Sequence, residues 1–281
     1  MIIAHTVDEM RSFTDKSRWN RKTIGFVPTM GALHDGHLSL VEMSGETCDV
    51  TVASIYVNPL QFNNPADYQT YPVTVESDLE RCREAGVSCV FLPSDEMMYT
   101  DQKTSVEVRD LTEHLCGAVR PGHFTGVFTV VTKLFNIVQP DYAFFGQKDI
   151  QQARSIEKMV FDLNIPVEIV LAPIIREADG LAMSSRNRHL SADEKKRALS
   201  LFNALSLADR CIRNGERDTA VICGKMRSLV ETEGQPDAVD YVSIVDYDSL
   251  QPLDVLSGKC VVALAAFFGT TRLIDNIIVS V

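Results

Sequence analysis

Two histidines and two glycines stand close together in residues 26–38, which read FVPTMGALHDGHL. The pattern is an apolar run, a turn containing Gly31, and a helical pattern that opens near Gly36. Strand-to-helix turns of this kind bind phosphates in α/β proteins, because glycine lets backbone N–H groups approach a ligand and the helix N-terminus offers unpaired N–H groups. His34 and His37 could add imidazole donors. The segment therefore predicts a site for a phosphorylated ligand.

Two familiar motifs are excluded in this segment. The spacing Gly-x-x-x-x-Gly mimics a P-loop, but His37 and Leu38 stand where a P-loop needs Lys and Ser or Thr. His34 and His37 are three residues apart and lack the glutamate of a zinc protease helix. A polar turn with two surface histidines remains the alternative.

Alternating apolar runs and helical patterns surround this segment, as in a parallel sheet with crossover helices. Strands are expected at 24–28, 50–57, 88–92, 142–145 and 167–172, and helices at 36–46, 74–85, 126–138 and 149–163. Beyond residue 176 come helices at 192–214 and 218–233 and strands at 238–245, 259–267 and 271–279, the pattern of a small α+β domain. Thr6 with Glu9 and Ser191 with Glu194 fit the capping box that begins a helix.

Composition limits the class of partner. The chain has 281 residues, 45% of them hydrophobic and 23% charged, which is ordinary for a globular protein, and its net charge is −11. Such a charge argues against nucleic acid as the main partner, so an anionic ligand must be held locally. The longest apolar run, 260–268, is too short for a membrane helix, and no signal peptide is recognisable. We expect a cytoplasmic protein whose seven cysteines, with no Cys-x-x-Cys pair, are reduced.

Five stretches together carry a family resemblance. Residues 30–37, MGALHDGH, resemble the His-x-Gly-His element of the nucleotidyltransferase superfamily, and the whole stretch is similar to the pantothenate synthetases (pantoate–β-alanine ligases). The stretches VNPLQF at 57–62, RPGHF at 120–124, FGQKDIQQ at 145–152 and GLAMSSRN at 180–187 match the same family in the same order.

The resemblance implies a fold and an activity. The fold is a Rossmann-like nucleotide- and pantoate-binding domain, residues 1–175, followed by a C-terminal α+β lid domain, residues 176–281. The reaction is the condensation of ATP-activated pantoate with β-alanine to give pantothenate, AMP and pyrophosphate through a pantoyl adenylate. Mg²⁺ accompanies ATP, and the particle is a homodimer built through the N-terminal domain.

The resemblance also implies roles for individual residues. His37, His34 and Lys148 are the expected catalytic residues. Pantoate is expected at Gln61 and Gln152, and β-alanine at Gln61. The residues expected to bind ATP are Met30, Gly31, Ala32, Leu33, His34, Asp35, Gly36, His37, Gly146, Gln147, Lys148, Asp149, Ile175, Met183, Ser184, Ser185 and Arg186.

Elementary chemistry agrees with several of these roles. A lysine at a helix N-terminus opposes the helix dipole, so Lys148 calls for an anionic partner, with a solvated lysine as the alternative. Lys148 supplies a point charge and Arg186 a fork for phosphate oxygens. Neutral amides such as Gln61 and Gln152 both donate and accept, which suits an acid that carries hydroxyl groups.

Other assignments leave more than one reading open. Asp78 is the expected metal ligand by family position, with an ordinary helix-face aspartate as the alternative. Arg120 and His123 fit a lid or phosphate contact, or a polar turn. His114 and His189 are expected at the surface, and Trp19 is expected to pack the first helix.

The chain also departs from its family, since Val73 and Thr125 stand where relatives often carry basic residues. Two other functions stay open: another adenylyl or cytidylyl transferase, which would not need β-alanine, and a nucleotide-sensing protein without turnover.

Overall fold

The structure is a computed structural model that describes residues 1–63 and 65–281. The chain forms two compact units. The first comprises Met1–Val108, Arg120–Gln147 and Ser155–Pro173, and the second comprises Arg109–Val119, Lys148–Arg154 and Ile174–Val281. Each is described by itself.

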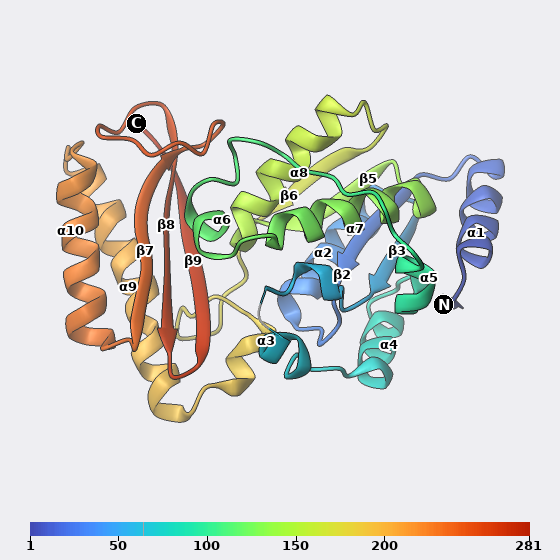
Figure 1. The fold of residues 1–281 in the computed structure, drawn as a ribbon, viewed down its shortest axis with the longest axis horizontal. Helices are drawn as coiled ribbons and strands as arrows, with labels where there is room; N and C mark the ends of the chain where they lie inside the picture. The colour runs from blue at the N-terminus through green and yellow to red at the C-terminus, as the bar shows by residue number, and fades with distance from the viewer. Residues whose placement is uncertain (64) are drawn as a thin grey trace. The chain divides into compact units, whose positions relative to one another are not determined.

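The first unit is built on a six-stranded parallel sheet in the order β1-β4-β3-β2-β5-β6 (Figure 1). Its strands are β1 (Ile2–Ala4), β2 (Ile24–Thr29), β3 (Val50–Ile55), β4 (Cys89–Phe91), β5 (Tyr142–Gly146) and β6 (Glu168–Ala172). Its longer helices are α1 (Val7–Trp19), α2 (Asp35–Thr47), α4 (Val75–Glu84), α7 (His123–Val138) and most of α8 (Ile150–Asp162). The predicted parallel sheet with crossover helices is thus confirmed, although the three-residue strand β1 was not predicted.

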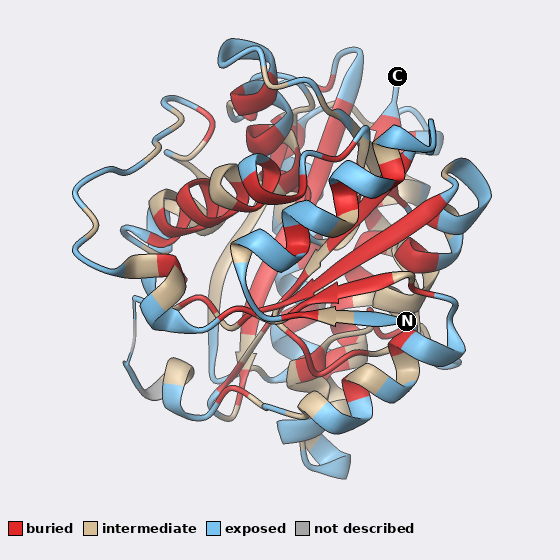
Figure 2. Cartoon of the chain, turned by 90° about the vertical axis from the view of Figure 1, so that its right-hand side faces the viewer, coloured by how far each residue is buried: buried red, intermediate tan, exposed pale blue. Residues whose placement is uncertain are grey.

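Helices cover both faces of this sheet. Side chains of α2 and α4 share a buried cluster with β2, β3 and β5. On the opposite face, Phe135 of α7 packs edge-on against Phe26 of β2 and Phe145 of β5. Figure 2 shows the central strands buried along their length. Their near-continuous apolar sequences follow from burial on both faces, as in other parallel sheets.

Short elements connect the long ones in the first unit. They are the 3-10 turn η1 (Pro59–Gln61) and the helices α3 (Pro65–Gln69) and α5 (Asp95–Tyr99). The 3-10 turn η2 (Gln147–Asp149) follows β5 and leads directly into α8. It begins in the first unit at Gln147 and continues in the second unit from Lys148.

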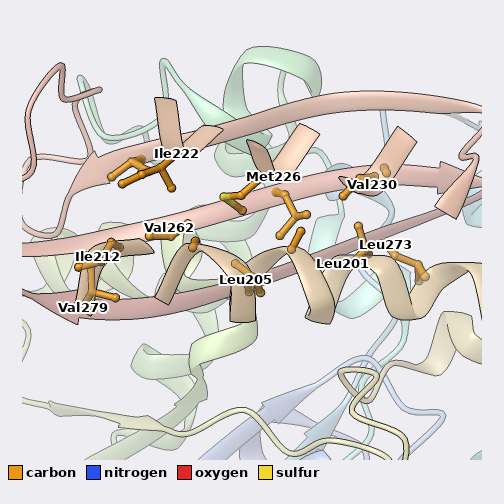
Figure 3. Packing of buried hydrophobic residues seen from close by; sticks show 14 of the residues in the cluster. Leu201, Leu205, Ile212, Ile222, Met226, Val230, Val262, Leu273 and Val279 are labelled. Carbon is orange, nitrogen blue, oxygen red and sulfur yellow. The ribbon is translucent and has the colours of Figure 1, made fainter. Parts of the chain in front are cut away.

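The second unit is a three-stranded antiparallel sheet in the order β7-β8-β9, covered on one face by two helices. Its elements are α6 (Leu115–Val119), the 3-10 turn η3 (Ser185–His189), α9 (Ala192–Arg213), α10 (Thr219–Leu229), the π-helical turn η4 (Val230–Gly234), β7 (Ala238–Asp246), β8 (Lys259–Phe268) and β9 (Thr271–Ser280). Figure 3 shows the core between helices and sheet, including Leu201 and Leu205 of α9, Met226 of α10 and Val262 of β8. The predicted α+β character is therefore confirmed.

Both predicted capping boxes are present. The Thr6 hydroxyl accepts from the N–H of Glu9, and the Ser191 hydroxyl accepts from the N–H of Glu194, while each glutamate bonds back to the cap backbone. Among the described residues, none of the helices is long and apolar enough to span a membrane.

Trp19 does not pack the first helix, contrary to the prediction. Helix α1 buries Met10, Thr14 and Ser17, which repeat every three to four residues and so lie on one side. Trp19 follows Ser17 by two residues and falls outside that stripe, and it is 89% exposed.

Candidate active site

Residues 30–37, here called the histidine loop, join β2 to α2 in the first unit. Gly31 and Ala32 both adopt left-handed backbone conformations, with φ of +81° and +49°. The Thr29 hydroxyl accepts from the N–H of Gly31 and donates to the carbonyl of Ser54, which ties the start of the loop to β3. The predicted glycine-bearing turn between a strand and a helix is therefore present.

Asp78 of α4 fixes the middle of the histidine loop. Its Oδ2 accepts from the N–H of Ala32 at 2.8 Å and from the Thr74 hydroxyl at 3.1 Å, and its Oδ1 accepts from the N–H of Leu33 at 2.8 Å. A Cβ at Gly31 would lie 2.9 Å from Oδ2, so the close approach requires glycine. Asp78 is 1% exposed.

The expected role of Asp78 as a metal ligand stays a prediction, and the structure gives its carboxylate other partners. Both acceptor positions of Oδ2 are used within the protein, and the carboxylate is buried against the loop backbone. Among residues 1–63 and 65–281, no group of three His, Cys, Asp or Glu side chains is arranged to hold a metal ion. What the structure shows is that Asp78 holds the backbone of the histidine loop.

The two histidines form the N-terminal cap of α2. Nδ1 of His34 accepts from the N–H of Gly36 at 3.2 Å, and Nδ1 of His37 accepts from the N–H of His34 at 3.3 Å. The ring centroids are 4.1 Å apart. A neutral imidazole that accepts at Nδ1 carries its proton on Nε2. The proton of each neutral ring is thus placed on Nε2, and both rings stand at a helix N-terminus, where anions are stabilised.

The Gln61 side chain, also in the first unit, is held in one orientation. Its Oε1 accepts from Nδ2 of Asn58 at 3.1 Å, and its Nε2 lies 2.7 Å from Sδ of Met30. Asn58 also donates to the carbonyl of Gly126, and its Oδ1 accepts from the Tyr99 hydroxyl at 2.6 Å. The Gln61 amide therefore accepts from Asn58 with its oxygen and donates to the Met30 sulfur with its nitrogen. Sequence reasoning did not assign Asn58 a role, although it caps the turn η1 directly before Pro59.

Arg120 and His123 lie next to the same residue. Nδ1 of His123 is 2.7 Å from the carbonyl of Gln61, which it reaches as a donor, and Nε2 is 3.2 Å from the Arg120 guanidinium. This contact supports the backbone of Gln61. Whether either side chain also contacts a phosphate stays a prediction.

Residues 148–154, here called the lysine segment, belong to the second unit. Nδ2 of Asn276 on β9 donates to the carbonyl of Lys148 at 3.0 Å. The buried Gln151 side chain donates to the carbonyls of Leu111 and His114, at 2.9 and 2.7 Å. These bonds explain why residues 109–119 and 148–154 join the second unit, whereas the sequence placed them before the boundary at residue 175.

The C-terminal end of the lysine segment is anchored through Arg154. Its guanidinium donates to Asp248 at 2.7 Å and lies 4.4 Å from the centroid of the Tyr247 ring. Lys259 lies over the same ring. Both ends of the lysine segment are thus bonded to the sheet region of the second unit.

Residues 176–188, here called the serine loop, also belong to the second unit. The N–H of Met183 bonds to the carbonyl of Ile175 at 3.0 Å, and the hydroxyl of Ser184 accepts from the N–H of Arg186 at 3.3 Å. Ser185 is buried. These two hydrogen bonds fix the part of the serine loop that carries the hydroxyls of Ser184 and Ser185 and the guanidinium of Arg186.

The predicted site residues divide between the units as follows. The first unit holds Met30, Gly31, Ala32, Leu33, His34, Asp35, Gly36, His37, Gln61, Asp78, Gly146 and Gln147. The second unit holds Lys148, Asp149, Gln152, Ile175, Met183, Ser184, Ser185 and Arg186. The histidines and Gln61 thus belong to one unit, and Lys148 and Arg186, the cations expected to bind phosphate, belong to the other.

His114 departs from its expected surface position. Its side chain is half-buried, and Nε2 lies 3.0 Å from Oε1 of Gln251. His189 is exposed, as expected.

Known proteins resemble the chain over its full length. The family model described as Pantoate-beta-alanine ligase matches residues 2–278. Pantothenate synthetases from Caldicellulosiruptor saccharolyticus and Thermotoga petrophila are 51% and 50% identical, with at least 99% of each chain covered. A pantothenate synthetase structure from Thermus thermophilus superimposes with a TM-score of 0.93 at 42% identity, covering 99% of both chains.

A second solved structure carries ligands. A pantoate–β-alanine ligase from Francisella tularensis, described as complexed with β,γ ATP and β-alanine, is 34% identical with a TM-score of 0.80 and covers 99% of this chain and 97% of its own. The chain belongs to the pantoate–β-alanine ligase family, the pantothenate synthetases.

Proposed function

We propose that this chain condenses pantoate with β-alanine at the expense of ATP, and that it does so through a pantoyl adenylate. Family membership over the whole chain supports the overall reaction, and the relative solved with an ATP and β-alanine supports two of the three substrates. The reaction needs activation because a free carboxylate is a poor acceptor for an amine.

One observation carries the assignment of the nucleotide. Both histidine rings of the cap of α2 accept backbone N–H groups at Nδ1, which places the ring proton of a neutral imidazole on Nε2, beside a helix N-terminus. Donors fixed in this way can stabilise charge on a phosphate without reorganising during the reaction. A general base would need the opposite arrangement, with an unprotonated nitrogen toward the substrate.

In the first step, the pantoate carboxylate attacks the α-phosphorus of ATP and pyrophosphate leaves. Negative charge grows on the α-phosphate oxygens and on the leaving group. We assign His34 and His37 to the α-phosphate, and Lys148 with the Ser184–Arg186 turn to the phosphates that depart. These groups stabilise charge and orient the ATP.

In the second step, the neutral amine of β-alanine attacks the carbonyl carbon of the pantoyl adenylate. The C–N bond forms, the C–O bond to AMP breaks, and the amine loses a proton. No protein nucleophile takes part, so positioning provides most of the rate. We assign Gln61 and Gln152 to the pantoate oxygens, with Gln61 also near β-alanine.

The Mg²⁺ expected to accompany ATP has no protein ligand in this account. Asp78, its expected ligand, is buried and bonded to the histidine loop. No step above is therefore assigned to a metal ligand of this chain.

The proposal is tested by product analysis of the purified protein with all three substrates and with each omitted in turn. We expect pantothenate and AMP in equal amounts, and neither without pantoate. AMP or pyrophosphate formation that is indifferent to β-alanine would indicate another nucleotidyl transferase, and ATP binding without turnover would indicate a nucleotide sensor.

Two further expectations concern the particle. A homodimer built through the N-terminal domain would double the chain's mass of 31.2 kDa in light scattering, and a monomer would contradict it. The expected cytoplasmic location is supported by the biosynthetic role of the curated relatives.

A further inference from the structure

We propose that Asp275 and Asn276, adjacent on β9, are positioning residues that hold the lysine segment and the serine loop in one fixed arrangement. The inference rests on the proposed function, because it concerns two segments assigned above to ATP. It adds two residues of the C-terminal strand that none of the five sequence stretches contains.

The two side chains are unusual for their place in the fold. Asp275 and Asn276 are 3% and 2% exposed, in a strand whose other buried positions include Leu273 and Val279. Neighbouring residues of a strand point to opposite faces, so the pair reaches both sides of the sheet. Asp275 shares its face with Leu273 and Val279, which pack into the core beneath the helices.

Asp275 holds the beginning of the serine loop. Its two oxygens accept from the two terminal nitrogens of Arg176, at 2.6 and 3.0 Å. Arg176 also donates to the carbonyl of Gly180 at 3.1 Å and lies over the Phe202 ring at 4.7 Å. Arg176 is thus fixed by a bidentate ion pair, a backbone bond and an aromatic face.

Asn276 holds the beginning of the lysine segment, through its bond to the carbonyl of Lys148. Its own N–H donates to Oδ1 of Asp275 at 2.8 Å, which couples the two residues. A continuous chain of hydrogen bonds therefore runs from Lys148 through Asn276 and Asp275 to Arg176.

The charges around Asp275 agree with this arrangement. Burial raises the pKa of Asp275, and the positive charges of Arg176 and Lys148 oppose that rise. A buried carboxylate needs such partners, and removing it would leave Arg176 without its ion pair. The charge of Arg176 is matched by Asp275, so we give Arg176 the role of fixing the serine loop. The cations assigned to phosphate are Lys148 and Arg186.

The second unit contains a matched control. Arg272 of β9 donates from Nε to Oδ2 of Asp240 on β7 at 2.6 Å, and both side chains are largely buried. The change Asp240→Asn removes an aspartate–arginine ion pair from the same sheet, as Asp275→Asn does. Arg272 contacts Cys116, Asp240 and the ring of Tyr241.

The test compares Asp275→Asn, Asn276→Asp and Asp240→Asn in the full-length chain. Calorimetry measures ATP binding, and steady-state kinetics measure the KM for ATP and for β-alanine. We expect the first two variants to weaken ATP binding by tenfold or more and to lower kcat/KM for ATP by about 10²-fold, since small misplacements cost rates of this order. In these two variants the KM for β-alanine should stay within about twofold of the wild-type value. Asp240→Asn should leave both ATP binding and kcat/KM for ATP unchanged.

A purely structural role predicts a different result. Equal losses of melting temperature in Asp275→Asn and Asp240→Asn, with ATP binding unchanged in both, would overturn the proposal. Should Asp275→Asn fail to fold, Arg176→Lys keeps the charge but not the bidentate pair, and a normal Kd for ATP in that variant would overturn it equally. If the wild type binds ATP but makes no pantothenate, the proposed function fails while calorimetry still tests the positioning.

Discussion

In the first unit, the histidine loop is fixed through its backbone N–H groups, which donate to the buried carboxylate of Asp78. In the second unit, the lysine segment is fixed through a backbone carbonyl, which accepts from the amide of Asn276. The first arrangement uses a negative charge that the loop's own donors satisfy. The second uses a neutral amide, with the nearby charge of Asp275 matched by Arg176.

The difference shows how a chain with a net charge of −11 can present a binding place for a triphosphate. Asp78 and Asp275 are both buried, and their oxygens accept from backbone N–H groups and from Arg176 within the protein. In the proposed site, the imidazole groups assigned to phosphate belong to one unit and the full cations belong to the other. The variants below are ordered by the size of the effect expected.

His37→Ala removes one charge-stabilising donor from the histidine loop and should lower turnover by about 10²-fold or more, equivalent to roughly 3 to 4 kcal/mol. Lys148→Ala should have an effect of similar size, because both act on the phosphates. Steady-state turnover of folded variants checks this, with His5→Ala as the control for losing an exposed histidine. Wild-type turnover in His37→Ala would remove this residue from the chemistry.

Asp78→Asn keeps the size of the side chain but places an NH₂ group against a backbone N–H of Ala32 or Leu33. A buried group left unpaired costs about 1 to 3 kcal/mol, so stability and turnover should both fall. The Mg²⁺ concentration that gives half-maximal activity should not move. A large shift of that concentration would restore Asp78 as a metal ligand, and Asp15→Asn, on the exposed face of α1, serves as the control.

Gln152→Leu tests the division of labour between the two amides. It should abolish most of the discrimination, about 10²-fold in kcat/KM, against a pantoate analogue that lacks one hydroxyl, while ATP affinity stays nearly unchanged. Gln61→Leu should in addition lower thermal stability, since it removes one of the two acceptors of the Asn58 amide and leaves the other at the Gly126 carbonyl. Equal losses of ATP and pantoate binding in Gln152→Leu would place that residue at the nucleotide.

Thr6→Ala and Ser191→Ala remove equivalent helix caps from the two units. Each should cost about 1 kcal/mol in the free energy of unfolding without changing any KM, which denaturant titration and kinetics measure. The backbone N–H groups of His5 and Ser191 hold the pKa of Glu9 and Glu194 below the ordinary value. The two ionised glutamates therefore stabilise the folded state at a pH above their ordinary pKa. This stabilisation is lost as the pH falls through their lowered pKa in the folded protein.

The longer helices and strands of both units could be predicted, because the residues that set their hydrophobic period and their caps lie within a few positions of each other. The same holds for the histidine loop, where the glycines and histidines that form the turn are adjacent in sequence. The roles of Asp78 and Asn58 could not be derived this way, because each depends on backbone groups brought close only by the fold.

The membership of residues 148–154 in the second unit was equally hidden. Asn276 and Lys148 are separated by 128 positions, and no periodic pattern links them. Trp19 is a different case. Its residue type alone predicts burial, but its position on α1 lies outside the buried stripe, and the side chain is exposed.

The adenylate is the central claim of this account, and isotope exchange tests it most directly. The protein is incubated with ATP, pantoate and labelled pyrophosphate, with β-alanine left out, and label entering ATP is measured. A pantoyl adenylate predicts exchange that depends on pantoate and needs no β-alanine. Exchange that occurs only when β-alanine is present, or that proceeds without pantoate, would contradict it.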